Sequence, residues 1–144
     1  LLIPPDLWSE YFKSLYKEYC DLAHSSGKAI FMHSDGHIQA IYPDLIEMGV
    51  DALNSQLFCM DMDYLEKIAK GKITFWGEID RQHILTAPDL ETGREAVRKA
   101  ARHFYDPAGG VFAQFSFTAG ANPDMPIALF EEWQRISDAQ KVDL

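Results

Sequence analysis

The chain passes at one point from the apolar run Lys28-Ala29-Ile30-Phe31-Met32 straight into the polar run His33-Ser34-Asp35-Gly36. A short apolar run that ends in turn-forming residues predicts a buried β-strand. The polar side chains then fall at the carboxyl end of that strand. In parallel α/β sheets, this end of the strands is where ligands bind.

The same step from apolar to polar residues recurs along the chain. The other predicted strands are residues 50–53, 73–76 and 111–115. They are followed by Asn54-Ser55-Gln56, by Gly77-Glu78-Ile79-Asp80-Arg81-Gln82 and by Ser116-Phe117-Thr118-Ala119-Gly120. Such near-continuous apolar strands are typical of a parallel sheet that is buried on both faces.

Helical patterns separate these strands, in segments near residues 6–26, 38–48, 61–70, 89–104 and 126–136. We expect the helices to open at Asp6, at Asp61 or Asp63, and at Asp89, with Pro126 in the first turn of the last one. The residues expected in the core are Trp8, Tyr19, Phe104 and Trp133. Those expected on a solvated outer face are Arg94, Arg98 and Arg102.

The resulting order, a helix followed by four βα units, predicts an α/β fold with a parallel sheet. Four strands cannot close a barrel, and an open sheet leaves its edges unpaired. We therefore expect the chain to need the rest of a barrel to complete its sheet. The remainder of the barrel would come from further residues or from a partner chain. A small open three-layer sheet is the alternative.

Composition narrows the class of function. The chain of 144 residues has a formal net charge of −9, which argues against a nucleic-acid partner because phosphate binding needs clustered Lys and Arg. No apolar run approaches the length of a membrane span, so no membrane partner is expected. Cys20 and Cys59 form no metal-type pair, and reduced thiols in a cytoplasmic protein are the expectation.

The predicted carboxyl ends of the strands hold two groups of candidate catalytic residues. His33 and Asp35 stand two residues apart and can transfer protons or ligate a divalent metal such as zinc. Glu78, Asp80 and Arg81 could act as acid, base and anion clamp. Each group also has a structural explanation: Asp35 could form a turn and cap the next helix, and an Asp-Arg pair could stiffen the loop.

Three further polar residues are candidates for contacting a small-molecule substrate, namely Asn54, Gln56 and Ser116. Amide and hydroxyl groups at strand ends can exchange hydrogen bonds with a ligand. Cys59 lies in the same loop as Gln56, and we expect it to be a buried structural thiol.

The order of these motifs resembles the C-terminal half of the uroporphyrinogen decarboxylase superfamily, which contains decarboxylases and zinc-dependent cobalamin or coenzyme M methyltransferases. The matching stretches are Ala23-His24-Ser25-Ser26-Gly27-Lys28, Met32-His33-Ser34-Asp35-Gly36, Gly49-Val50-Asp51-Ala52-Leu53-Asn54, Phe75-Trp76-Gly77-Glu78-Ile79-Asp80 and Pro123-Asp124-Met125-Pro126. The resemblance implies a (β/α)₈ TIM barrel enzyme, in which residues 1–144 supply roughly the C-terminal half of a single barrel domain.

The resemblance leaves three functions open. A uroporphyrinogen decarboxylase-like lyase would act on a carboxylated tetrapyrrole or a related substrate without a cofactor, although Ala119 stands where the decarboxylases have a late His. A methyltransferase would need a divalent metal; His33 matches its first ligand, while Asp35 stands in place of the first Cys. The third function is a non-catalytic half-barrel that binds a ligand.

Overall fold

The structure is a computed structural model that describes residues 1–141. Helices and strands alternate in the predicted order, which makes the chain an α/β protein. The elements are α1 (Pro5–Trp8), a π-helical turn (Ser9–Lys13), α2 (Ser14–Ser25), β1 (Phe31–Ser34), a 3₁₀ turn (Gln39–Ile41), α3 (Tyr42–Met48), β2 (Ala52–Ser55), a second 3₁₀ turn (Leu57–Cys59), α4 (Met62–Ala69), β3 (Thr74–Glu78), α5 (Leu90–Phe104), β4 (Val111–Gln114) and α6 (Met125–Lys141).

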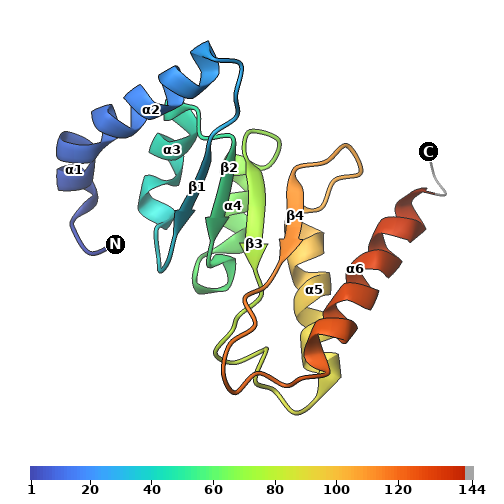
Figure 1. Ribbon diagram of the computed structural model, residues 1–144. Coiled ribbons are helices and arrows are strands. Elements are labelled where there is room, and N and C mark those ends of the chain that lie inside the picture. The colour runs from blue at the N-terminus through green and yellow to red at the C-terminus, as the bar shows by residue number, and fades with distance from the viewer. Residues whose placement is uncertain (142–144) are drawn as a thin grey trace.

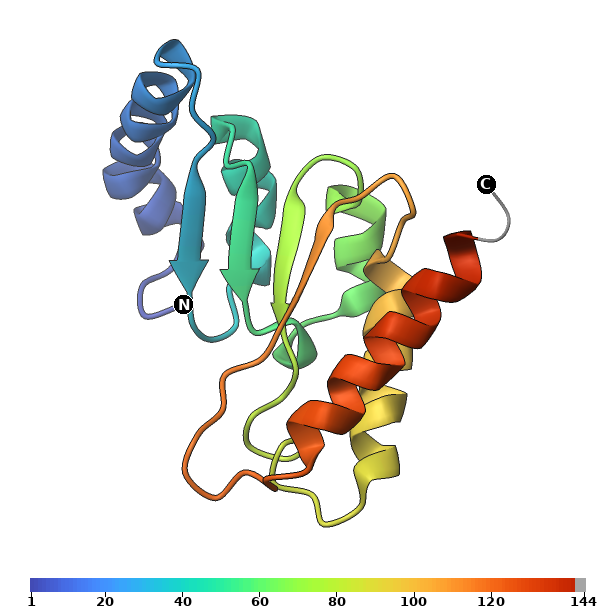
Figure 2. The same cartoon turned by 45° about the vertical axis from the view of Figure 1, so that its right-hand side comes forward.

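The four strands form one sheet in the order β1-β2-β3-β4, and each neighbouring pair is parallel. Because this order never reverses, right-handed crossovers place the connecting helices on the same face of the sheet. In both views, α3, α4 and α5 lie behind the sheet, while α2 and α6 lie at its two ends (Figures 1 and 2). The described chain therefore has two layers, and the three-layer alternative is wrong.

The core lies between the sheet and these helices. Leu53 of β2 and Phe75 of β3 point into it, and the Phe75 ring packs on Phe104 of α5 with 4.3 Å between centroids. Leu45 of α3 and Leu65 of α4 are fully buried beside them. Burying a side chain of this size stabilises a fold by about 1.5–3 kcal/mol. These contacts fix the helices to one face of the sheet.

The other face of the sheet carries a row of aromatic side chains. Trp76 of β3 packs between Phe31 of β1 and Phe112 of β4, with ring centroids 4.5 and 4.7 Å apart. Phe31 and Phe112 remain 50% and 52% exposed. The expectation that the strands are buried on both faces is therefore wrong for the described residues, because their helices cover one face alone.

The first two strands begin two or three residues later than the sequence pattern predicts. After Gly27, the amide of Lys28 still donates to the carbonyl of Ala23, and after Gly49 the amide of Val50 donates to that of Leu45. Both glycines have positive φ, which completes a Schellman motif at the end of each helix. These residues therefore belong to helix ends, and the strands take in His33 and Asn54.

Helix capping follows the predictions at two of the helices. Asp61 accepts a hydrogen bond from the amide of Tyr64 at 3.0 Å, and Asp89 accepts one from the amide of Glu91 at 3.1 Å. Pro126 lies in the first turn of α6. The prediction for Asp6 is wrong: Pro4 is the N-cap residue of α1, and Asp6 lies within its first turn.

The long N-terminal helix exposes much of its apolar face. Trp8 and Phe104 are buried and Trp133 is half-buried, as expected for core residues. Tyr19 is 65% exposed, so its predicted place in the core is wrong. Leu22 is equally exposed, because the core-facing side of α2 is narrow and carries Cys20.

Among the described residues, no helix combines the length and apolar character that crossing a membrane requires.

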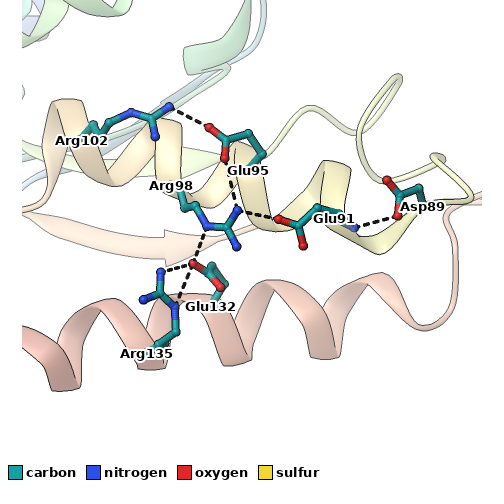
Figure 3. Close-up of polar contacts among 7 residues, drawn as sticks. All are labelled: Asp89, Glu91, Glu95, Arg98, Arg102, Glu132 and Arg135. Carbon is teal, nitrogen blue, oxygen red and sulfur yellow. Dashed lines mark hydrogen bonds and ion pairs between the residues drawn. The ribbon is translucent and has the colours of Figure 1, made fainter.

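The last two helices pack side by side and share an ion-pair cluster (Figure 3). Glu132 of α6 is 4% exposed and accepts hydrogen bonds from Arg98 of α5 at 2.9 Å and from Arg135 at 2.5 Å. Arg98 thus joins two helices, which corrects its predicted place on a solvated face. Arg94 also pairs with α6, through Glu131 at 3.2 Å, and its side chain is 27% exposed, so its predicted place on a solvated face is corrected too. Arg102 is 60% exposed and pairs with the exposed Glu95, as that prediction requires.

Candidate functional site

The carboxyl ends of all four strands bring polar side chains to one edge of the sheet. His33 of β1 is in register with Asn54 of β2, and Glu78 of β3 with Gln114 of β4. Side chains alternate along a strand, so these residues lie on the face opposite Met32, Leu53 and Val111, which pack into the core. The site therefore lies where the open face of the sheet meets its carboxyl edge.

One chain of hydrogen bonds runs across the sheet from β1 to β4. His33 Nδ1 lies 2.5 Å from Asn54 Oδ1. Asn54 Nδ2 donates both to the carbonyl oxygen of Trp76 and to Gln114 Oε1, each at 2.7 Å. Asn54 is 7% exposed, whereas the His33 side chain is 51% exposed. A buried amide thus holds an imidazole at the surface of the site.

A second set of contacts joins the loops above the sheet. Arg81 Nη2 donates to Asp35 Oδ1 at 3.1 Å, and Arg81 Nη1 lies 3.9 Å from Glu78 Oε2. Ser116 Oγ donates to the other carboxylate oxygen of Glu78 at 2.7 Å. His33 Nε2 lies 3.9 Å from Asp35 Oδ2, which connects this set to the first one. Six predicted site residues therefore form one connected group: His33, Asp35, Asn54, Glu78, Arg81 and Ser116.

A pocket of about 350 Å³ adjoins this group at the ends of β2 and β3. Its lining includes Glu78, Asp80 and Arg81 from one loop, and Gln56 and Cys59 from the other. A volume of this order can accept a small organic molecule. A second pocket of about 380 Å³ lies at the amino ends of the strands, and none of the predicted site residues lines it.

Asp80 lines the pocket but faces its own loop. Its carboxylate accepts hydrogen bonds from the amides of Gln82 and His83, and it lies 2.9 Å from His83 Nδ1. Partial burial would raise the pKa of Asp80, but the hydrogen bonds from His83 and these amides outweigh it, so the pKa is lowered. Asp80 therefore organises the loop as a carboxylate, and Arg81 pairs with Asp35 and Glu78 instead of with Asp80.

Gln56 and Cys59 hold the loop that follows β2. Gln56 Oε1 accepts a hydrogen bond from the amide of Gly36 at 2.8 Å, which ties this loop to the one after β1. The Cys59 thiol donates to the carbonyl of Gln56 at 3.0 Å. Cys59 is exposed, so its predicted burial is wrong, and partial desolvation raises the pKa of its thiol.

The site contains two residues beyond those that the sequence predicts. Gln114 lies in register with Glu78. It is the one polar residue of the predicted strand 111–115, which is the signal that could reveal it. His83 is not among the predicted site residues, yet it lines the pocket and pairs with Asp80. Its spacing of three residues from Asp80 places both in one loop turn, which the sequence alone could have suggested.

The donor set for a metal at this edge is small. His33 Nε2 and Asp35 Oδ2 could hold a divalent ion between them, but Asp35 already accepts a hydrogen bond from Arg81. Within residues 1–141, the group of three close His or carboxylate ligands is Asp63, Glu66 and His103, on the outer surface of α4 and α5. Catalytic zinc sites use three protein ligands, and the described site offers two.

The arrangement is suited to proton transfer. It combines an exposed imidazole, an exposed carboxylate, a buried carboxylate and one guanidinium beside a pocket of ligand size.

No protein-family model matches this sequence, and no curated protein matches it with significance.

Proposed function

We propose that this chain is the C-terminal half of a (β/α)₈ barrel enzyme of the uroporphyrinogen decarboxylase superfamily. Its activity in this proposal is that of a lyase that decarboxylates a carboxylated tetrapyrrole or a related substrate. The observation that carries the proposal is the connected group of His33, Asp35, Asn54, Glu78, Arg81 and Ser116 at the carboxyl edge of a parallel sheet. This edge is where barrel enzymes hold their catalytic residues.

The arrangement of the sheet supports the barrel. Consecutive parallel strands with helices on one face have the curvature and layering of a barrel segment, whereas doubly wound sheets reverse their strand order. The strands at both ends, β1 and β4, have an unpaired edge within the described chain. The aromatic row of Phe31, Trp76 and Phe112 occupies the face that a closed barrel fills with side chains. Four further strands would cover both the edges and this row.

The chemistry requires a proton to reach the substrate and another to replace a carboxylate. Protonation of a pyrrole carbon turns the ring into an electron sink. The electron pair of the bond to the carboxylate then moves into the ring, and carbon dioxide leaves. The methylene carbon takes a proton to become a methyl group, and the ring carbon loses its own. The net reaction consumes one proton and releases one carbon dioxide.

His33 and Asp35 are placed to move these protons, because both side chains are exposed at the open edge and their nearest atoms are 3.9 Å apart. Glu78 is buried and is held by Ser116 and Arg81, so we assign it an electrostatic role at the base of the site. Asp80 shapes the pocket through its loop. Gln56 lines the pocket, whereas Asn54 is buried and supports His33 from below. Arg81 faces two carboxylates, those of Asp35 and Glu78.

The test is anaerobic incubation of the purified full-length protein with uroporphyrinogen. Decarboxylation would release carbon dioxide and produce tetrapyrroles with progressively fewer carboxyl groups, which chromatography after oxidation separates. Glu78→Gln should lower the rate of release, while Glu131→Gln, on the outer surface of α6, should leave it unchanged. If carbon dioxide release does not exceed that of the buffer, the lyase proposal is wrong.

Metal-dependent methyl transfer is a second candidate, favoured by the separation of 3.9 Å between His33 Nε2 and Asp35 Oδ2. The described residues supply two ligands, so the remaining ligands would have to come from elsewhere in the barrel. Metal analysis of the purified protein, followed by an assay with and without a chelator, separates this candidate from the lyase. A protein that binds the tetrapyrrole but shows neither activity would be the non-catalytic half-barrel.

A further inference from the structure

The backbone carbonyl of Trp76 fixes the orientation of the Asn54 amide, which belongs to a series of hydrogen-bonded side chains that ends at His33. A carbonyl oxygen can only accept a hydrogen bond, so the Asn54 atom that lies 2.7 Å from it must be the amide nitrogen. The same nitrogen lies 2.7 Å from Gln114 Oε1, so both of its hydrogens have an acceptor. Asn54 Oδ1 must then face His33, and it can only accept from the imidazole.

We infer that Asn54 and Gln114 are positioning residues that hold His33 as its Nδ1–H tautomer, with Nε2 as the atom that exchanges protons. Nδ1 lies 2.5 Å from Asn54 Oδ1 and must carry its hydrogen there. In the neutral ring, Nε2 then keeps its lone pair. Histidine in water favours the opposite tautomer, with the hydrogen on Nε2. The protein therefore selects the less common form through one buried amide.

This selection has a consequence for the proposed activity, on which this part of the inference rests. Nε2 lies on the side of Asp35, at 3.9 Å from Oδ2, in a side chain that is half exposed. When Nε2 takes a proton, Nδ1 keeps its donor bond to Asn54, and the new N–H faces a carboxylate. His33 can thus accept and deliver a proton at one atom without turning its ring. A His held in the other tautomer would present an N–H where the reaction needs a base.

Gln114, on the last strand, is the far end of this hydrogen-bonded series. Its Oε1 accepts the second hydrogen of Asn54 Nδ2, although the two residues are 60 positions apart in the sequence. Without it, Asn54 Nδ2 would keep the backbone carbonyl of Trp76 as its one acceptor among the described contacts. We therefore expect the loss of Gln114 to loosen Asn54, and the loss of Asn54 to remove the preference for Nδ1–H.

Nitrogen NMR of the imidazole rings in the full-length protein, at a pH where histidine is neutral, tests this assignment without a substrate. The Nδ1 resonance of His33 should have the shift of a protonated nitrogen and the Nε2 resonance that of an unprotonated one. His33→Gln identifies these signals. Asn54→Leu should exchange the chemical shifts of Nδ1 and Nε2, and Gln114→Leu should move them partway toward each other. Gln114→Glu keeps an acceptor oxygen and should retain the shifts of the unaltered protein.

His83 provides an internal control for folding. Its Nδ1 lies 2.9 Å from Asp80 Oδ2, so its resonances should stay in place in every variant at Asn54 or Gln114. An Nε2–H tautomer at His33 in the unaltered protein would overturn the inference, and so would Asn54→Leu without effect on the His33 shifts while those of His83 are retained. The expected shifts without any decarboxylation would leave the positioning role standing and reject the lyase.

Discussion

Arg81 Nη2 lies 3.1 Å from Asp35 Oδ1, although the two residues are 46 positions apart and follow different strands. The guanidinium also approaches the buried Glu78 at 3.9 Å. This pair joins the loops after β1 and β3 into one surface. It explains how residues that the sequence spreads over the chain form one candidate site.

Asp35→Asn should separate stability from activity. The Asp35 side chain is 56% exposed, and exposed ion pairs contribute at most about 1 kcal/mol to folding. The free energy of unfolding in urea should therefore change by less than that amount. The decarboxylation rate should fall at least about tenfold, because the carboxylate beside His33 is lost. Asp21→Asn is the control, since it removes an exposed pair with Lys17 outside the site. Equal rates for both variants would remove Asp35 from the mechanism.

Gly77→Ala should destabilise the fold where β3 packs against Leu57. A Cβ atom added to Gly77 would lie 2.5 Å from Cδ1 of Leu57, which is 3% exposed. Overpacking of this kind costs about 1–3 kcal/mol. Combining it with Leu57→Ala should cost less than the sum of the two single changes, because the second removes the clashing atom. If the two losses in unfolding free energy simply add in the double variant, the close approach of residue 77 to Leu57 is contradicted.

Much of this arrangement could be predicted from the sequence, because local patterns encode it. The glycines after α2, α3 and α4, the caps at Asp61 and Asp89 and the polar residues after each strand all depend on neighbours a few positions away. The exact strand limits could not be predicted, because the amides of Lys28 and Val50 donate hydrogen bonds to carbonyls of the preceding helices. The predicted positions of His33 and Asn54 beyond the strand ends shifted for that reason.

The partners within the site were harder to predict than its members. Asp80 could not be assigned to its own loop, since that depends on how the amides of Gln82 and His83 turn. The contact of Gln114 with Asn54 crosses 60 residues and requires the sheet register. The exposure of Tyr19 was also missed, because helical spacing shows an apolar face but not what covers it.

Glu132 should make folding stability depend on pH in the acid range. Hydrogen bonds from Arg135, then from Arg98, lower the pKa of this buried carboxyl to about 2 despite the opposing effect of burial. An unfolded glutamate has a pKa of about 4.3. Its contribution is therefore complete above that pH and is lost as the pH falls toward 2.

The measurement is the unfolding free energy of the unaltered protein and of Glu132→Gln between pH 2 and 6. The variant should lose about 1–3 kcal/mol at pH 6 and approach the unaltered protein near pH 2. Glu131→Gln, with a side chain 58% exposed, is the matched control and should follow the unaltered curve. A constant difference across the whole range would show that Glu132 acts through packing and not through its charge.

The two cysteines should differ in their reactivity toward an alkylating reagent. Cys59 is exposed and Cys20 is buried, so mass spectrometry should find label on Cys59 in the folded protein and on Cys20 only after unfolding. Because partial desolvation and the nearby Asp80 raise the pKa of the Cys59 thiol, its labelling at neutral pH should be slower than that of a free thiol. Faster labelling than a free thiol would contradict this environment.

The central claim is that His33, at the open carboxyl edge of the sheet, transfers protons to a carboxylated substrate. The most direct measurement is kcat/KM for carbon dioxide release from uroporphyrinogen by His33→Gln, compared with His37→Gln, an exposed histidine four positions further along the chain. We predict that His33→Gln lowers kcat/KM by about 100-fold or more, as expected for loss of a general acid-base group, and that His37→Gln leaves it unchanged. Equal values for the two variants would contradict the account.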